Sequence, residues 1–191
     1  MNVDQAILSR RSIRRFQQQP IPLDVLKKFV NAARLAPSGS NLQPLEYCLV
    51  TEKALCDQVF EALNWAGYIQ PKWTPNEHER PVAYIIILIN DMTNQFYLRD
   101  VGLATENILL YAEGEHIGSC ILCNINRNKL QEVLNIPHRL GIDSVIAFGY
   151  KGEIAVAEEF TDSVKYWRDE LGVHHVPKRS LDNILHYNKF K

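Results

Sequence analysis

The sequence predicts one α+β or three-layer domain in which helices flank a small sheet. Segments with helical spacing alternate along the chain with short apolar runs that have the length of strands. The 191 residues are 46% hydrophobic and 23% charged, which is ordinary globular composition and enough for one sizeable core. Repeats, low-complexity segments and obvious linkers are absent from the sequence, and helices are expected to outnumber strands.

The first half of the chain begins with a short helix expected over Val3–Ser9. Apolar residues at helical spacing follow from Leu23 to Ala33, and that helix should end before Pro37 because the residue before a proline is disfavoured in a helix. The pattern then predicts a strand, a helix, an irregular aromatic and proline-rich segment and a buried strand, over Tyr47–Thr51, Ala54–Leu63, residues 64–81 and Val82–Asn90.

The second half should contain the longest helix, within Phe96–Glu115. Its apolar surface is broad, which is typical of a helix that is central in its domain or faces another subunit. A strand, a short helix and another strand are expected over Ile117–Leu122, Lys129–Leu134 and Ser144–Tyr150. The tail from Glu153 to Lys191 has little periodicity before Leu181–Leu185, so we expect it to wrap around something such as a second subunit.

Charge and hydropathy narrow the class of protein. The formal net charge is −1, which gives no indication of a nucleic-acid or membrane partner, yet residues 1–30 carry six basic and two acidic side chains. A local positive patch in a neutral protein favours a small anion. The longest apolar run, Val82–Ile89, is too short to span a bilayer and no signal peptide is visible, so a cytoplasmic location with free thiols is expected.

Three polar segments are candidates for an anion site, and each has an ordinary structural alternative. Ser9–Phe16, SRRSIRRF, offers guanidinium groups and hydroxyls suited to phosphate, but such a run is as often a solvated basic surface. Pro37–Asn41, PSGSN, is rich in hydrogen-bonding groups, although it also fits a helix stop followed by an asparagine turn. His174–Leu181, HHVPKRSL, contains a basic pair that fits a surface loop equally well.

The sequence contains no convincing catalytic set of side chains. Cys120–Cys123, CILC, has the spacing of a redox pair or half a zinc site, but it lies in an apolar strand and buried cysteine is usually a small hydrophobe. Glycine-rich nucleotide loops, a GxSxG motif and an HExxH motif are all missing from the sequence, and no metal site is expected. Anion-binding segments without a nucleophile and base favour a protein whose cofactor carries the reactivity.

Taken in order, four segments resemble the nitroreductase family of FMN-dependent oxidoreductases, and the resemblance covers nearly the whole chain. The segments are RRSIRRF, AARLAPSGSNLQP, RDVGLATENILLYAEGEHIGSC and HVPKRSL. The resemblance implies a nitroreductase-like three-layer α/β/α sandwich with a small mixed or antiparallel sheet, in an intertwined homodimer with FMN at the subunit interface. Residues 1–191 would form a single FMN-binding domain, with 64–81 as an active-site or interface insertion and 153–191 wrapping the partner subunit.

The resemblance also implies roles for individual residues. The basic motif, with Arg10, Arg11, Ser12 and Arg14, would hold the FMN phosphate, ribityl chain and pyrimidine edge, and the tail pair Lys178 and Arg179 would bind phosphate. The polar loop would approach the flavin from the other subunit through Pro37, Ser38, Gly39, Ser40, Asn41 and Gln43. The end of the Ile117–Leu122 strand would pack on the isoalloxazine and offer a main-chain N–H to flavin N5, through Ile121, Leu122, Cys123 and Asn124.

One departure from the family pattern stands out, because many relatives have small residues where this chain has Cys123 and Asn124. A main-chain N–H does not depend on the side chain, so the expected contact to N5 is retained, whereas the larger side chains would narrow the site. The aromatic residues Trp65, Tyr68 and Trp73, with His78, have two interpretations: they line the substrate mouth or they pack in an interface.

The implied activity is electron transfer from NADH or NADPH to an electron-poor acceptor, such as a nitroaromatic or a quinone, by a ping-pong mechanism. Flavin N5 would carry the chemistry, and Arg14 would stabilise negative charge near the flavin pyrimidine. Four alternatives remain open. They are other flavin reactions on the same fold (dehalogenation, enone reduction or flavin cleavage), a flavin-binding protein with little turnover, a nucleotide-binding protein, and a thiol oxidoreductase that uses Cys120 and Cys123.

Overall fold

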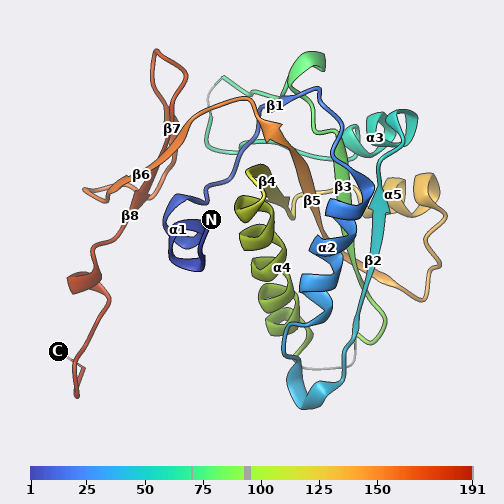
Figure 1. The fold of residues 1–191 in the computed structure, drawn as a ribbon, viewed down its shortest axis with the longest axis horizontal. Helices are drawn as coiled ribbons and strands as arrows, with labels where there is room; N and C mark the ends of the chain where they lie inside the picture. Colours follow the sequence, from blue (N-terminus) through green and yellow to red (C-terminus); the bar gives the residue numbers. More distant parts are fainter. Residues whose placement is uncertain (70, 93–95, 191) are drawn as a thin grey trace.

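An antiparallel sheet forms the centre of the molecule in the computed structural model, which describes residues 1–69, 71–92 and 96–190. Strand β5 pairs with β3, β4 and β1, and β3 pairs in turn with β2 (Figure 1). The strands of this sheet are β1 (Phe16–Gln17), β2 (Leu45–Val50), β3 (Ala83–Ile89), β4 (Ile117–Leu122) and β5 (Gly141–Lys151).

Helices cover both faces of this sheet, so the body has the expected α/β/α layers. On one face α2 and α4 pack on the sheet, with α1 beside α4, and α3 and α5 lie on the other face (Figure 1). The helices are α1 (Val3–Ser9), α2 (Leu23–Arg34), α3 (Lys53–Phe60), α4 (Tyr97–Gly114) and α5 (Arg127–Leu134), with short 3-10 turns η1 (Gly39–Asn41), η2 (Glu77–Glu79) and η3 (Leu181–Asn183).

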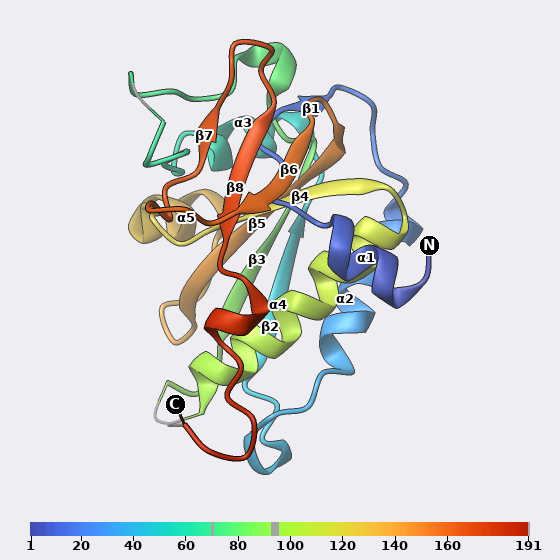
Figure 2. The ribbon, with the colours of Figure 1, turned by 90° about the vertical axis from the view of Figure 1, so that its left-hand side faces the viewer.

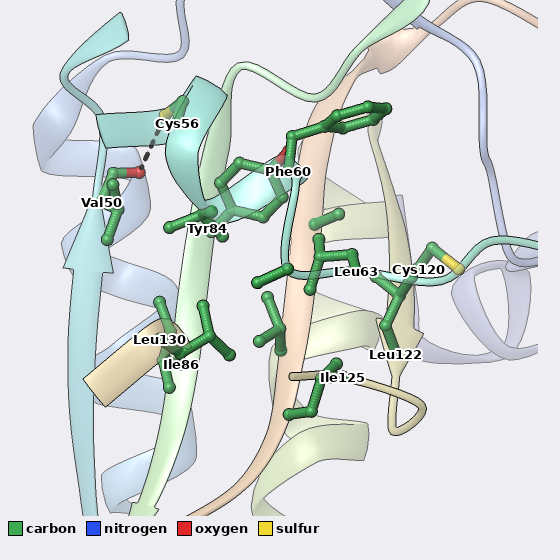
Figure 3. Packing of buried hydrophobic residues seen from close by; sticks show 14 of the residues in the cluster. Val50, Cys56, Phe60, Leu63, Tyr84, Ile86, Cys120, Leu122, Ile125 and Leu130 are labelled. Carbon is green, nitrogen blue, oxygen red and sulfur yellow. Dashed lines mark hydrogen bonds between the residues drawn. The ribbon is translucent and has the colours of Figure 1, made fainter. Parts of the chain in front are cut away.

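The core is divided by the sheet into two clusters of buried side chains. Every residue of β3 is buried, which explains why its sequence, AYIIILI, is continuously apolar rather than alternating. Tyr84 and Ile86 point to the cluster under α3 and α5, together with Leu130 and Phe60 (Figure 3). Ile85 and its neighbours on the same side of the sheet pack under α2 and α4.

The tail forms a small second sheet that the sequence did not predict. Strand β8 (His174–Lys178) lies between β6 (Ala155–Glu159), with which it is parallel, and β7 (Trp167–Arg168), with which it is antiparallel. We call residues 153–180 the arm. The arm stands to one side of the body, and the chain after it runs apart from the body to the C-terminus (Figures 1 and 2).

Several expected boundaries and counts were wrong. Helix α3 ends at Phe60 rather than at Leu63, and β5 begins at Gly141 rather than at Ser144. Strands outnumber α-helices in the described ranges, because β1 and the three strands of the arm were not expected. The expected bounds of α1 and β4 were confirmed, and the apolar α4 lies within Phe96–Glu115 as expected.

Candidate functional site

The basic motif, residues 9–16, lies along the edge of β4. Ser12 and Ser119 form a parallel bridge, and the backbone N–H of Ile13 donates to the carbonyl of Ser119 at 2.9 Å. The approach is close, because a side chain at Gly118 would meet Ile13 at 3.0 Å. The structure therefore brings the basic motif next to the strand whose last residues are the predicted flavin-facing segment.

The first two arginines of the motif are tied to their own helix and to α4. The guanidinium of Arg10 is 3.5 Å from the carboxylate of Glu106 on α4. Arg11 donates to the carbonyls of Arg10 and, at 2.9 Å, of Leu8. Burial and the nearby charge of Arg10 lower the pKa of Arg11 below its ordinary value, and Glu113 partly offsets the shift. The motif therefore gathers positive charge at the end of α1.

Arg14 points away from α1 and toward the arm. Its guanidinium Nη1 lies 2.9 Å from Nε2 of His174 and stacks over the ring of Tyr166 at 4.6 Å. A guanidinium only donates, so His174 Nε2 accepts and the imidazole is neutral with its proton on Nδ1. His174 is completely buried, and burial together with the charges of Arg14 and Arg168 lowers its pKa to about 4.

We expect His174 to make stability depend on pH. Between its ordinary pKa of 6.5 and its folded pKa of about 4, the unfolded chain binds a proton that the folded chain excludes. The free energy of unfolding should therefore fall by up to about 3 kcal/mol as the pH drops through this window. Urea unfolding at pH 7 and pH 4.5 measures the loss, and His174→Gln should remove it while leaving an acceptor for Arg14.

The adjacent histidine provides the control for this comparison. His175 bonds Glu158 and Asp169, which raise its pKa, so it stabilises the fold at low pH and loses that contribution as the pH rises through its folded pKa. His175→Gln should therefore steepen the loss of stability on acidification. A His174→Gln variant with the wild-type pH dependence would contradict the assignment.

The polar loop, residues 37–43, is built on the first turns of α4. The N–H of Gly39 donates to Asp100 Oδ1 at 2.9 Å, and the N–H of Gln43 donates to Ser38 Oγ at 3.1 Å. A side chain at position 39 would come within 2.7 Å of Phe96, so only glycine fits. Left-handed backbone at Ser40, Asn41 and Gln43 completes a loop that is tightly shaped within its own subunit.

Within one chain the polar loop and the basic motif do not meet. The loop contacts α4 through Asp100 near the start of that helix, whereas the residues around the motif contact it at Glu106 and Glu113. The two segments lie at opposite ends of α4 (Figures 1 and 2). A cavity of about 170 Å³ adjoins the loop, and Asp100 is one of its lining residues. Oδ2 of Asp100 has no hydrogen-bond partner among the described residues.

The end of β4 presents the predicted flavin-facing segment. Leu122 is buried and Ile121 partly buried, while Cys123 and Asn124 are exposed. The carbonyl of Asn124 accepts the backbone N–H of Asn64 at 3.1 Å, which fixes the chain just after the strand. The segment therefore continues an ordered strand edge, and its exposed end lies beside the 64–81 segment.

The two thiols of the CILC sequence are poor nucleophiles. Cys120 is buried and Cys123 exposed, and burial raises the pKa of both, with Asp143 adding to the effect at Cys123. For the flavin reaction that the resemblance implies, we expect Cys120→Ala to leave the rate of reduction by NADH or NADPH within about twofold of wild type. Anaerobic stopped-flow absorbance measures this rate, and lost reduction with FMN still bound would support a thiol mechanism.

The basic pair of the tail lies at the end of the arm. Lys178 ends β8 and its carbonyl accepts the N–H of Phe160 at 2.8 Å, while Arg179 donates to the carbonyl of Asn183 at 2.6 Å. Both side chains are exposed. Lys178 lies on the same strand as His174, and Arg179 directly follows that strand. Strand β8 therefore links the basic pair to His174, the residue that contacts Arg14.

Segment 64–81 contacts both the body and the arm of its own chain. Trp65 is buried and stacks on Phe60 at 5.7 Å between ring centroids. Trp73 lies between two guanidinium groups, those of Arg15 at 5.5 Å and Arg168 at 4.6 Å. The described part of the segment thus joins the body to the arm, and its relation to a substrate or to a partner subunit stays a prediction.

Sequence reasoning missed several residues that shape this region. Glu153, Tyr166 and His174 all surround Arg14, and Asp100 fixes the polar loop. Glu153 and Tyr166 lie at least 139 positions from Arg14, so no local pattern marks them. His174 belongs to the HHVPKRSL segment that the sequence singled out, but its contact with Arg14 was not expected. Asp100 had one signal, because an acidic residue in the first turn of an apolar helix complements the helix dipole.

Comparison with known proteins agrees with the fold. The model of the nitroreductase family matches residues 7–150. A protein of Archaeoglobus fulgidus named "Putative NADH dehydrogenase/NAD(P)H nitroreductase" is 31% identical over 148 residues, covering 75% of this chain and 82% of its own. An iodotyrosine deiodinase of Thermotoga neapolitana is 24% identical over 158 residues, covering 74% and 84%.

A solved structure extends the likeness over almost the whole chain. The structure of an FMN-dependent nitroreductase from Clostridium difficile R20291 aligns with a TM-score of 0.70 at 22% identity, covering 97% of this chain and 98% of that one. Within the described ranges, no helix is long and apolar enough to cross a membrane. The sandwich architecture, the matched length and the shared identity agree, and the chain belongs to the nitroreductase family.

Proposed function

We propose that the protein is an FMN-dependent oxidoreductase that transfers electrons from NADH or NADPH to an electron-poor acceptor, such as a nitroaromatic or a quinone. The observation that carries this proposal is the set of guanidinium groups and the Ser12 hydroxyl beside β4, the strand that leads to the exposed residues Cys123 and Asn124. Family membership supports the oxidoreductase class, and relatives named as NAD(P)H nitroreductases support the donor.

The donor set fits the chemistry of FMN. A phosphate accepts several hydrogen bonds and favours guanidinium groups, which Arg10 and Arg11 supply with Ser12 nearby. Arg14 uses one N–H on His174, and a guanidinium has five, so donors remain for the pyrimidine edge of a flavin. The motif would hold the phosphate and ribityl chain, and Ile121 to Asn124 would pack on the ring.

FMN, when bound, supplies the two-electron chemistry, and the residues of this chain bind and orient it. Arg14 would place positive charge where the reduced flavin carries negative charge, which raises the tendency of the flavin to accept hydride. The main chain at Cys123 and Asn124 would donate an N–H toward N5. Because one open site would serve donor and acceptor in turn, a ping-pong order follows.

A second subunit would complete the site. Apolar side chains are exposed on α1, on α4 and along the tail, where a monomer gains nothing from them: Val3, Ile7, Leu8, Leu98, Leu103, Leu181, Ile184, Leu185, Tyr187 and Phe190. A groove of about 710 Å³ between α1, α2 and α4 adds to this surface. A homodimer would cover these residues and bring the partner's polar loop to the flavin, and a monomeric mass by sedimentation would contradict this.

Reductive dehalogenation is the second candidate reaction. It is favoured by relatives named as iodotyrosine deiodinases in Thermotoga neapolitana and Nematostella vectensis, which are 24% and 21% identical to this chain. Enone reduction, flavin cleavage and flavin binding with little turnover have no comparable observation in their favour. The acceptor therefore decides between two reactions of the same reduced cofactor.

One series of measurements tests both candidates. The purified protein should be yellow, or should bind added FMN, and anaerobic NADH or NADPH should bleach the visible absorbance. The reduced protein is then mixed with a nitroaromatic, a quinone and an iodinated tyrosine, and reoxidation is followed for each. A colourless protein that binds no FMN would overturn the proposal, and bound FMN that neither nicotinamide reduces would favour a binding role.

A further inference from the structure

One buried carboxylate joins the basic motif to the arm. Glu153 lies in the turn between β5 and β6, and its side chain is only 1% exposed. Its Oε1 accepts the backbone N–H of Arg14 at 2.5 Å and that of Arg15 at 3.2 Å, while Oε2 accepts from Arg168 Nη2 at 2.6 Å. A single side chain therefore joins its own turn to two other segments, residues 14–15 and Arg168.

The arrangement fixes the main chain at Arg14. The N–H of Gly152 donates to the carbonyl of Arg15 at 2.8 Å, so the turn and the motif are joined in both directions. A buried carboxylate is stable only when it is paired and hydrogen-bonded, and Arg168 provides the charge while the two N–H groups fill the second oxygen. Any displacement of the motif would leave this carboxylate unsatisfied.

The side chain of Arg14 is fixed from the same direction. His174 accepts from its guanidinium, Tyr166 lies against its face, and both residues belong to the arm. The N–H of His174 also donates to the carbonyl of Ile154, next to Glu153, at 2.8 Å. Glu153 thus holds the backbone of Arg14, and His174, whose own backbone is bonded next to Glu153, holds its guanidinium.

We propose that Glu153 is a positioning residue of the flavin site, which acts on FMN through Arg14 without touching the cofactor. The inference rests on the proposed function, because Arg14 is the residue expected at the flavin pyrimidine. Its consequence is specific: the effect of Glu153 on FMN affinity depends on the Arg14 side chain. A residue that only stabilises the arm would affect affinity equally with or without that side chain.

A double-mutant cycle tests this dependence. FMN is titrated into apoprotein, and quenching of its fluorescence gives the dissociation constant for wild type, Glu153→Gln, Arg14→Ala and the double variant. Glu153→Gln keeps the volume and one acceptor oxygen but loses the charge that pairs with Arg168. We expect it to raise the dissociation constant about tenfold in the wild-type background and less than about twofold when Arg14 is already alanine.

The control is Glu158→Gln in the same arm. Glu158 pairs with His175 and accepts from Trp167, away from Arg14, so FMN affinity should stay within about twofold of wild type. Near-UV circular dichroism of each variant checks the fold. If Glu153→Gln does not fold, Glu153→Asp keeps the charge, lengthens the contacts, and should show the same dependence on Arg14 with a smaller effect.

The outcomes separate the two proposals. Wild-type protein that binds no FMN overturns the proposed function and this inference with it. Wild-type protein that binds FMN, with equal losses from Glu153→Gln in both backgrounds or with no loss in either, leaves the function standing and overturns the positioning role. A loss confined to the background that contains Arg14 supports it.

Discussion

Arg10→Ala should weaken FMN binding by about 10- to 100-fold, the range expected for a lost charge-assisted hydrogen bond to a phosphate. Arg10 lies where α1 ends, with its guanidinium held by Glu106 on α4 at 3.5 Å. That ion pair is partly exposed and long, so a phosphate would compete well for the same donors. Fluorescence titration of FMN into apoprotein measures the change.

Two further variants sharpen the Arg10 experiment. Arg10→Lys keeps the charge but not the planar pair of donors, so it should recover only part of the affinity. Arg139→Ala removes an exposed arginine that precedes β5 and should leave binding at the wild-type level. Equal affinities for wild type and Arg10→Ala would exclude Arg10 from the cofactor site.

Ile146→Ala should lower the free energy of unfolding by about 2 to 5 kcal/mol, the usual range for an isoleucine truncated to alanine in a core. Ile146 is completely buried in β5, where it pairs with Ile85 of β3 and Ile121 of β4. It packs in the cluster under α2 and α4, and rigid strands on both sides limit how far the cavity can close.

Urea unfolding of the wild-type protein and of Ile146→Ala measures the loss in the free energy of unfolding. Val164→Ala is the matched control, because that side chain is 66% exposed in the arm and its truncation should change stability by less than about 0.5 kcal/mol. A loss at Ile146 below about 1 kcal/mol would mean that the central strands repack around the missing atoms, and that the close packing assigned to this sheet is wrong.

The elements of the body were predictable because their own residues determine them. The Asn2 capping box and the short apolar pattern define α1, and Leu26, Phe29 and Ala33 supply the buried side of α2. The run AYIIILI has one simple explanation, a strand covered on both faces. Strand β5 begins at Gly141 rather than at Ser144 because Leu88 and Ile89 of β3 pair with Ile142 and Gly141.

The arm was not predictable because no part of it looks like a strand in isolation. Strand β6 is AVAEE, β7 has two residues, and β8 contains Pro177, which cannot donate to a ladder. Pairing between distant segments creates them, helped by the stack of Trp167 on His175 at 4.2 Å. The candidate site divides in the same way, since the contiguous motifs were visible in the sequence, whereas Glu153 and the contact of His174 with Arg14 were not.

The position of the basic motif has a consequence for the order of folding. Its partners are Ser119, Lys151 and Glu153, so the contacts that shape it join residues more than 100 positions apart. At about 5 to 20 residues per second, a nascent chain needs roughly 8 to 30 seconds to complete the sheet that receives this segment. The basic motif is synthesised first among the segments of the candidate site, and it can make these contacts only once Glu153 has been synthesised.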